Sequence, residues 1–171
     1  MGQNLNIYKI QDEYVKYLRT VEPKVLQNKE EKRPYIGTVL EITGYTYFIP
    51  LSSPKKKHKD MKNMKDFHKI EGGKYGVINF NKIIPVPKKC IIDFKFEDEE
   101  DIEYRTLLQN QHSCIKDMKS IIINKSNGIY SLFHTDDKNL SKNDLKVKQR
   151  CCNFDLLEKM CDEYQTNKDT N

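Results

Sequence analysis

The sequence predicts an α+β fold, because strand-like and helix-like patterns occupy different parts of the chain. Residues 35–96 contain several short runs rich in β-branched and aromatic residues, separated by turn-forming residues, which is typical of antiparallel strands. From Ile102 onwards, apolar residues recur every three or four positions, as they do on one face of an amphipathic helix. Strands followed by helices are typical of the α+β class. The 171 residues can form one well-buried core but are few for two, so we expect a single domain over residues 1–171.

A short strand and a short helix are expected before residue 35. Residues 5–10 alternate between apolar and polar side chains, as in a strand. Asp12 is a suitable N-cap for a helix, and Pro23 would end it. The apolar face of this helix would consist of Tyr14, Val15, Leu18 and Val21. Residues 22–32 are polar and show no periodicity, so they are expected to form an exposed loop.

The next segment predicts a β-hairpin with polar residues at its exit. Two β-rich runs, residues 35–42 and 45–51, flank Thr43-Gly44, which can form the turn. The second run is followed by Ser52, Ser53, Pro54, Lys55, Lys56, Lys57 and His58. Serine donates hydrogen bonds to phosphate and lysine acts as a point charge, so a rigid hairpin with this ending is suited to binding phosphate. The same pattern is typical of a solvated loop, and both interpretations stay open at this point.

After the hairpin, the sequence predicts a short helix and several more strands. Pro54 suits the first position of a helix that would run to Met61. Turn-forming pairs at Gly72-Gly73 and Asn81-Lys82 separate the β-rich runs that follow. We expect these strands at residues 67–70, 75–80, 83–86 and 90–96.

The last third of the chain predicts helices. A long amphipathic helix is expected from Ile102 to Ile122, and Gly128 is expected to mark a bend before a second helical piece at residues 130–133. The polar residues 134–148 are expected to form a loop. Asn153 can cap a final helix whose apolar stripe contains Phe154, Leu157, Cys161 and Tyr164.

Composition limits the classes of protein to consider. The net charge of +5 falls short of the strongly basic composition of an obvious nucleic-acid binder, but the charge is unevenly distributed. The five cysteines show no C-x-x-C pair or zinc-ligand spacing, so we expect reduced thiols and no metal site. We also expect a cytoplasmic protein, because no signal peptide or membrane-spanning apolar run is present. The basic block comprises Lys55, Lys56, Lys57, Lys59, Lys62 and Lys65, and an acidic block covers residues 97–101.

The motifs of the sequence limit the kinds of reaction that the protein could catalyse. Gly72-Gly73 lacks the spacing of a nucleotide-binding loop, and the four histidines are scattered along the chain. What remains is a group of Ser, Lys, Tyr, Arg and His residues around the hairpin. Such a set suits metal-free phosphoryl transfer on RNA, in which the ribose 2′-hydroxyl attacks the adjacent phosphate and the protein stabilises charge.

Four segments, which occur in the same order along nearly the whole chain, carry a resemblance to a known family. They are residues 7–10 leading to residues 14–18, residues 35–42, residues 51–56 with His58, and residues 152–158. With these segments the chain resembles the ToxN and AbiQ proteins, the endoribonuclease toxins of type III toxin–antitoxin and phage-defence systems. The third segment is the most specific. It departs from the family pattern at Ser52, where threonine is common, and at Lys57, where an aromatic residue can occur.

The resemblance implies a fold and a set of partners. The fold would be a strongly twisted antiparallel sheet with packed helices, similar to the MazF and CcdB toxins. The partner would be a repeated antitoxin RNA that the toxin itself cuts and that then inhibits it as folded pseudoknots, in a cyclic toxin–RNA assembly. Cellular and phage RNAs would be the substrates, and no cofactor would be needed.

The resemblance also implies roles for residues around the hairpin. Lys55 would stabilise the phosphate as charge builds on it, Ser53 and Ser52 would donate hydrogen bonds, and Tyr14 would orient the RNA or stack on it. Arg33 would clamp a neighbouring phosphate. The general base is left open between His58 and a buried lysine. RNA-binding residues would be Arg33, Lys56, Lys57, His58, Lys59 and Lys62.

Two other classes of function stay open from sequence. One is a non-catalytic module that binds RNA or DNA through the basic block. The other is a CcdB-like toxin that acts on a protein, because the same fold can carry different functions. The pairing of Ser53 with Lys55 favours the enzyme.

Overall fold

The sheet is antiparallel at every strand pair of the computed structural model, which describes residues 5–42 and 44–169. The sheet contains seven strands in this part of the chain: six lie in the order β4-β5-β3-β2-β1-β7, and the seventh, β6, pairs with β3 beside this path. The strands are β1 (Asn6–Ile10), β2 (Tyr35–Ile42), β3 (Tyr45–Ser52), β4 (Phe67–Lys69), β5 (Val77–Asn79), β6 (Ile84–Pro85) and β7 (Ile91–Ile92). The predicted α+β class and antiparallel sheet are confirmed. The similarity to MazF and CcdB stays a prediction.

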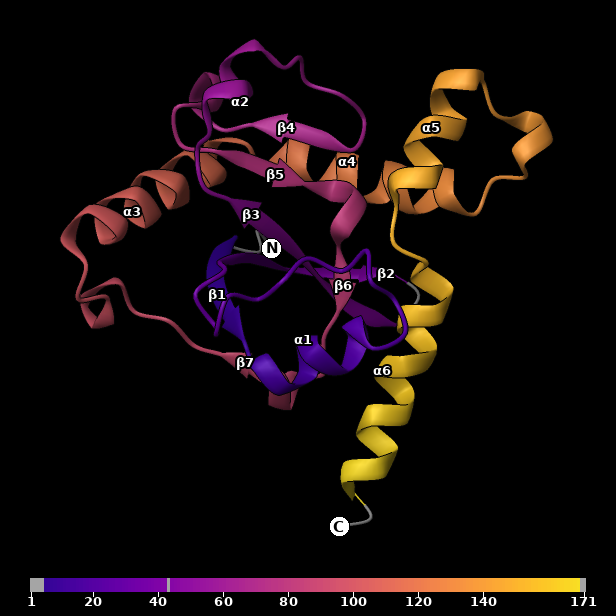
Figure 1. Ribbon diagram of the computed structural model, residues 1–171, viewed down its shortest axis with the longest axis horizontal. Coiled ribbons are helices and arrows are strands. Elements are labelled where there is room, and N and C mark those ends of the chain that lie inside the picture. The colour runs from indigo at the N-terminus through magenta and orange to yellow at the C-terminus, as the bar shows by residue number, and fades with distance from the viewer. Residues whose placement is uncertain (1–4, 43, 170–171) are drawn as a thin grey trace.

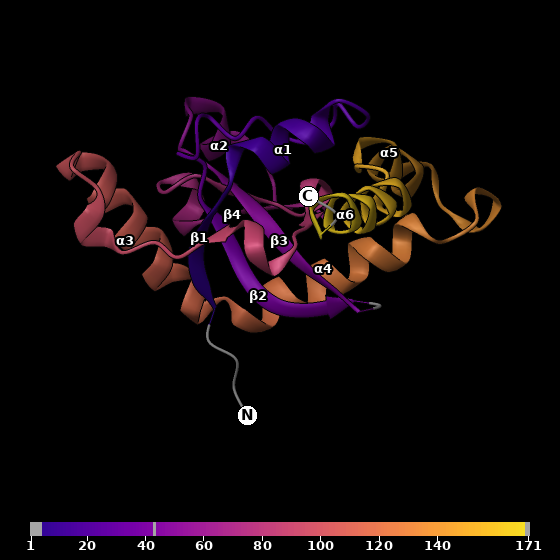
Figure 2. The ribbon, with the colours of Figure 1, turned by 90° about the horizontal axis from the view of Figure 1, so that it is seen from below.

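The helices cover the sheet from different sides. Figures 1 and 2 show α1 and α4 on opposite sides of the strands, with α6 running along one side of the molecule. The core between them includes the fully buried side chains of Tyr35, Phe80 and Phe154. No helix of the described residues is long and apolar enough to cross a membrane. The helices are α1 (Asp12–Arg19), α2 (Lys56–Asp60), α3 (Ile102–Asp117), α4 (Lys119–Phe133), α5 (Lys142–Arg150) and α6 (Phe154–Asp169).

Strand β3 is held from both sides at the point where it ends. Leu51 donates its main-chain N–H to the carbonyl of Pro34 beside β2, at 3.0 Å. On the other edge, Leu51 and Ser52 pair with Ile78 and Val77 of β5. A strand with neighbours on both edges has little freedom, so the residues that follow it start from a fixed position. The predicted turn of the β2–β3 hairpin includes Thr43, which lies outside the described residues.

A glycine allows the first half of the hairpin to pack tightly. A Cβ atom on Gly37 would lie 2.2 Å from the Tyr8 ring, so only glycine fits there without displacing that ring. The pairing of β2 with β3 also shifts in register between Gly37 and Leu40, which marks a bulge. The bulge changes the twist of the hairpin locally.

The predicted long helix is divided at a different place. Helix α3 ends at Asp117 and α4 begins at Lys119, because Met118 has φ −97° and ψ 10°, which departs from helical geometry. The predicted bend at Gly128 is wrong, since α4 continues through this residue. The apolar spacing continues across Met118, so periodicity alone could not locate the break.

The loop predicted for residues 134–148 is also wrong in part. Helix α5 begins there, with the Ser141 hydroxyl accepting a hydrogen bond from the N–H of Asp144 at 3.1 Å. Val147 is buried and anchors this helix. Because α5 is mostly polar, its apolar pattern is weak, and the N-cap at Ser141 indicates the start of this helix more clearly.

The segment before β2 is more buried than the sequence predicts. Val25 lies in the core, and the buried Asn28 donates from its side chain to the carbonyl of Ile10 at 2.8 Å. Asp12 is the first residue of α1 rather than its cap, which is Gln11. The predicted cap of α6 is confirmed, because the Asn153 side chain accepts from the N–H of Leu156 at 3.1 Å.

Candidate active site at the exit of strand β3

The hydroxyl of Ser52 is fixed by two donors from other elements. Asn79 of β5 donates its side-chain amide to Ser52 Oγ at 2.9 Å. Arg33 Nη1 lies 3.4 Å from the same oxygen and 2.8 Å from the carbonyl oxygen of Leu51. Since Ser52 Oγ accepts from both, its own proton remains available to donate. The end of β3 therefore presents an oriented hydroxyl group.

Two glycines bring a second loop against this corner. A Cβ atom on Gly76 would lie 1.9 Å from the carbonyl oxygen of Ser52, and one on Gly73 would lie 2.9 Å from the carbonyl of His58. Both glycines have positive φ, +93° and +94°, in the left-handed region that favours glycine. Glycine at these positions therefore lets the loop before β5 support the main chain of residues 52–58.

His58 belongs to the framework of α2. It is 3% exposed, and its Nδ1 accepts from the main-chain N–H of Lys55 at 3.0 Å, while its own N–H donates to the Lys55 carbonyl at 2.9 Å. Nδ1 can accept only in the neutral ring, so the proton lies on Nε2. Burial, with the charges of Lys57 and Lys55, lowers the pKa of His58 below its ordinary value. The predicted RNA contact by His58 is therefore corrected, because its buried ring holds the start of α2.

This arrangement predicts that the free energy of unfolding of the protein falls at acidic pH. Because the folded-state pKa of His58 is lowered, the unfolded chain binds more protons below about pH 6.5, and the stability given by His58 is lost as pH falls through that range. His58→Gln keeps an acceptor at the same helical position but does not titrate. We expect the free energy of unfolding of the parent to fall more steeply between pH 6.5 and 5 than that of His58→Gln, measured by urea denaturation. Equal slopes would contradict this role.

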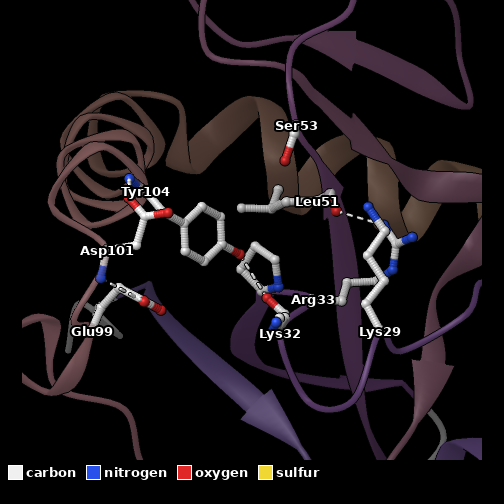
Figure 3. Close-up of a pocket in the computed structure, with 9 residues that line it drawn as sticks. Lys29, Lys32, Arg33, Leu51, Ser53, Glu99, Asp101 and Tyr104 are labelled. Carbon is white, nitrogen blue, oxygen red and sulfur yellow. Dashed lines mark hydrogen bonds between the residues drawn. The ribbon is translucent and has the colours of Figure 1, made fainter.

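A cavity of about 300 Å³ opens beside the serines. Figure 3 shows residues from three separate parts of the chain around it: the segment before β2, the end of β3 and the start of α3. Ser53 is exposed and lines the cavity. The lining residues are Lys29, Lys32, Arg33, Pro34, Leu51, Ser53, Glu99, Asp101 and Tyr104.

Lys29 reaches the cavity from a strained turn. Lys29, Glu30 and Glu31 have φ values of 55°, 55° and 66°, and the left-handed conformation costs a non-glycine residue about 1 to 2 kcal/mol. The turn is tied down because Glu31 Oε2 accepts from the N–H of Asp12 at 2.9 Å. Lys29 is exposed at the edge of the cavity, and desolvation there, together with the charges of Arg33 and Lys55, lowers its pKa. Lys29, Arg33 and Lys55 therefore form one positive cluster beside the serines.

Arg33 is mostly committed to the framework but keeps one free nitrogen. It is 8% exposed, and its Nε donates to the carbonyl of Gln27 at 2.6 Å. With Nη1 bound to Leu51 and Ser52, only Nη2 makes no hydrogen bond among the described residues. A phosphate clamp by Arg33 would therefore use Nη2, at the cavity.

The predicted basic block lies on the surface next to this site. Lys55 and the other lysines of the block are exposed, and of these only Lys65 forms an ion pair among the described residues, with Asp144 at 2.7 Å. Lysines without acidic partners keep their charge available for a polyanion. The available set is Lys55, Lys56, Lys57, Lys59 and Lys62.

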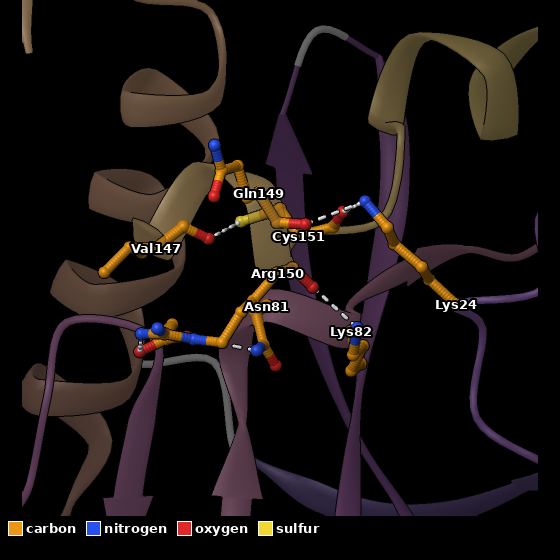
Figure 4. Close-up of polar contacts among 8 residues, drawn as sticks. Lys24, Asn81, Lys82, Val147, Gln149, Arg150 and Cys151 are labelled. Carbon is orange, nitrogen blue, oxygen red and sulfur yellow. Dashed lines mark hydrogen bonds and ion pairs between the residues drawn. The ribbon is translucent and has the colours of Figure 1, made fainter. Parts of the chain in front are cut away.

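Basic residues farther away serve the fold instead. Figure 4 shows Lys24 donating to the carbonyls of Gln149 and Cys151, and Lys82 donating to the carbonyl of Arg150. Arg150 in turn binds the carboxylate of buried Asp66 at 2.9 Å. These contacts fix the end of α5 on the sheet, so a basic residue alone does not indicate an RNA contact in this protein.

Tyr14 does not lie at the site. It is fully buried on α1, its hydroxyl donates to the carbonyl of Pro85, and its ring contacts that of Tyr164 with centroids 5.0 Å apart. The expectation that Tyr14 stacks on RNA is therefore corrected, because its whole side chain is enclosed in the core. The helical spacing that placed Tyr14 with Leu18 was the signal for burial.

Several residues of the site were not found from sequence. Asn79 and Tyr104 lie in ordinary strand and helix patterns that carry no chemical signature. Lys29 lies in a segment that was expected to be an exposed loop. The acidic block at residues 97–101 was visible in the sequence as a cluster of charge. Its position beside the hairpin depends on the tertiary fold, so the sequence did not place it at the site. No three His, Cys, Asp or Glu side chains of the described residues gather closely enough to hold a metal ion.

One known protein family matches nearly the whole of this chain. Residues 6–162 match the family model for toxin ToxN of the type III toxin–antitoxin system. The chain belongs to the ToxN family. The match includes every strand, helices α1 to α5 and most of α6, and therefore the whole candidate site.

Three proteins of the family show sequence similarity over most of their lengths. The endoribonuclease ToxN of Bacillus thuringiensis subsp. kurstaki is 32% identical over 166 residues, which is 95% of this chain and 85% of that protein. The endoribonuclease AbiQ of Lactococcus lactis subsp. lactis is 30% identical, over 92% of this chain and 88% of AbiQ. The endoribonuclease ToxN of Pectobacterium atrosepticum is 29% identical, over 90% of each chain.

Three solved structures share the fold of this chain. One, from work on selective toxin inhibition by a non-coding RNA pseudoknot, aligns with a TM-score of 0.82 at 32% identity, over 95% of this chain and 98% of that chain. AbiQ, a lactococcal anti-phage endoribonuclease of the type III system, aligns with a TM-score of 0.77 at 29% identity, over 95% and 99%. A third, from work on a processed non-coding RNA that regulates a bacterial antiviral system, gives 0.71 at 26%, over 90% and 95%.

Proposed function

We propose that residues 1–171 form one endoribonuclease domain that acts as the toxin of a type III toxin–antitoxin system. The observation that carries this proposal is the convergence of Ser52, Ser53 and the positive cluster at the fixed end of β3, in a chain of the ToxN family. Oriented hydroxyls beside cations suit a reaction in which negative charge builds on phosphate oxygens. The endoribonuclease names of the relatives support the same activity.

The proposed step is an internal transfer at the scissile phosphate. The ribose 2′-hydroxyl gives its proton to a base and its oxygen attacks phosphorus. The bond from phosphorus to the 5′-oxygen breaks, this oxygen takes up a proton from water, and a 2′,3′-cyclic phosphate and a 5′-hydroxyl result. Lys55 stabilises the charge on the non-bridging oxygens, while Ser53 and Ser52 donate hydrogen bonds to them. Lysine and arginine side chains supply the positive charge at this site, so we propose that the reaction needs no metal ion.

Lys29 is our candidate for the proton acceptor from the 2′-hydroxyl. It lines the cavity together with Ser53, and its lowered pKa increases the fraction of free amine, so the neutral form would accept this proton while Arg33 and Lys55 carry the positive charge of the cluster. His58 fits this role poorly, because it is buried and its Nδ1 already accepts from the main chain of Lys55.

The proposed inhibitor is a repeat-derived RNA pseudoknot that the toxin itself cuts out of a longer transcript. This proposal is supported by the related structures, one described for inhibition by an RNA pseudoknot and one for a processed non-coding RNA. The exposed lysines of the basic block would follow the RNA backbone, with Arg33 Nη2 on a phosphate near the cavity. We further propose that toxin and RNA units close into a cyclic assembly and that cellular and phage RNAs are the substrates.

The nature of the nucleophile provides the test of this function. A short RNA that the protein cuts should become resistant when the nucleotide before the cleaved bond carries a 2′-deoxyribose, because the attacking oxygen is then absent. Cleavage of the unmodified RNA should continue in excess EDTA. The measurement is the rate of product formation on a denaturing gel, with the product ends identified by mass spectrometry.

The substrate and the chelator provide separate controls. A 2′-deoxy substitution two nucleotides away from the cleaved bond should leave the rate nearly unchanged. Normal cleavage of the 2′-deoxy substrate at the scissile position would contradict the proposed nucleophile, and complete inhibition by EDTA would contradict a metal-independent reaction.

A further inference from the structure

The cavity beside Ser53 has one wall that the phosphate chemistry does not explain. Lys29 and Arg33 line one side, whereas Glu99 and Asp101 line another, as Figure 3 shows. Carboxylates repel the RNA backbone, so this wall is unsuited to phosphate. It is suited to a neutral group that carries hydrogen-bond donors.

The acidic wall is held in place by its own contacts. Asp101 Oδ1 accepts from the N–H of Tyr104 at 3.0 Å and caps α3, and Glu99 Oε1 accepts from the N–H of Asp101 at 3.2 Å. Lys9 Nζ lies 3.8 Å from Glu99 Oε2, and Asp101 Oδ2 makes no hydrogen bond among the described residues. Each carboxylate can accept about four hydrogen bonds, so both keep acceptor capacity toward the cavity.

An aromatic ring stands beside these carboxylates. Tyr104 is half-buried, and its hydroxyl donates to the carbonyl of Lys32 at 2.6 Å, which fixes the ring at the cavity. Aromatic faces of this kind stack on unpaired RNA bases. On the opposite side, Arg33 is 8% exposed and is held by hydrogen bonds from Nε and Nη1, while its Nη2 makes no hydrogen bond among the described residues and can donate to a phosphate.

We propose that this cavity binds one nucleobase next to the cleaved bond and selects a base that carries an exocyclic amino group. The inference rests on the proposed endoribonuclease function, and it assigns a specificity role to Asp101, Glu99 and Tyr104. The base would stack on Tyr104 and donate its amino hydrogens to the carboxylates, while Arg33 holds the adjoining phosphate.

Size and hydrogen-bonding chemistry decide which bases fit. A cavity of about 300 Å³ lies at the small end of ligand pockets, so it suits a single base rather than a helix. Adenine, cytosine and guanine each carry an amino group. Uracil presents carbonyl oxygens where the amino group would be, and these would face the carboxylates without a shared proton. Uracil at this position should therefore be disfavoured.

The test uses a set of short RNAs that differ in one nucleotide at each position flanking the cleaved bond. At one of these positions, single-turnover cleavage of the uridine RNA should be on the order of tenfold to a hundredfold slower than that of the best amino-bearing base. Removing the amino group alone, by placing purine riboside instead of adenosine there, should also slow an adenosine substrate.

Three variants test whether Asp101 and Glu99 cause the preference against uridine. Asp101→Asn keeps the cap of α3, and Glu99→Gln keeps the acceptor for the N–H of Asp101, so both should fold. Each replaces an acceptor-only carboxylate by an amide that also donates, so each should bring the uridine RNA closer to the others in rate. Glu100→Gln removes the same charge from an exposed residue that does not line the cavity, and it should keep the preference of the parent.

The outcomes separate this inference from the function on which it rests. Cleavage at equal rates for all four bases at every flanking position would overturn the inference and leave the endoribonuclease intact. A uridine penalty that stays the same in both Asp101→Asn and Glu99→Gln would also overturn it. Failure of the parent to cut any RNA would overturn the function and the inference together.

Discussion

Lys55→Ala and Ser53→Ala should each lose cleavage on the order of a hundredfold to a thousandfold, while the protein stays folded. Both residues follow a strand that is fixed on both edges, and both side chains are exposed at the positive cluster. Removing one oriented group from a developing oxyanion costs about 3 to 4 kcal/mol of barrier. The changes should be small in the free energy of unfolding, about 0.5 kcal/mol or less, because exposed side chains are removed. Cleavage of RNA, thermal unfolding and binding of antitoxin RNA should be measured on the same samples.

Lys57→Ala is the matched control for charge. It removes one exposed lysine from α2, the short helix that Lys55 precedes, and should weaken RNA binding modestly without slowing the chemical step. If Lys57 neutralises one phosphate, the slope of log affinity against log salt should fall by about 0.7 to 0.9. An effect of Lys57→Ala on cleavage as large as that of Lys55→Ala would indicate that charge density, rather than position, is what matters.

Gly76→Ala should damage both the fold and the site. The added Cβ would lie 1.9 Å from the carbonyl oxygen of Ser52, and the residue has φ +93°. Left-handed strain and overpacking together predict a loss of about 2 to 5 kcal/mol in the free energy of unfolding. Relief of the clash would move the main chain of Ser52, so the folded fraction should also cut RNA more slowly. Urea denaturation and cleavage normalised to the folded fraction measure the two effects.

Gly72→Ala separates strain from contact. Gly72 also has positive φ, +60°, but a Cβ there would meet nothing within 4 Å. Its loss should be about 1 to 2 kcal/mol, and its cleavage rate should match that of the parent. Equal losses of stability in the two variants would contradict the proposed contact between Gly76 and the end of β3.

Local patterns predicted the parts of the fold that depend on local interactions. The hairpin strands, the strand before α1 and the Asn153 cap of α6 were predicted because alternation and capping are encoded within a few residues. The break at Met118 was not, because apolar spacing continues through it. Helix α5 was missed because its burial depends mainly on Val147 and its cap at Ser141 is a single short signal.

Most of the predicted residues that lie at the site are adjacent in sequence, and the exception is Arg33, which was expected there from the family resemblance. Ser52, Ser53 and Lys55 lie together at the end of one strand, so the sequence alone placed them side by side. Lys29, Asn79 and Tyr104 reach the same corner from distant segments, and residue type gives no sign of that approach. The roles expected of Tyr14 and His58 were corrected because solvent exposure depends on the packed structure.

The single-turnover cleavage rate of Lys55→Ala, at enzyme concentrations that saturate the RNA, tests the account most directly, because it isolates chemistry from binding. We expect a rate at least about a hundredfold below that of the parent, with an unchanged melting temperature and a normal rate for Lys57→Ala. A rate within threefold of the parent, or a loss of rate that follows a loss of thermal stability, would show that the ribonuclease centre lies elsewhere.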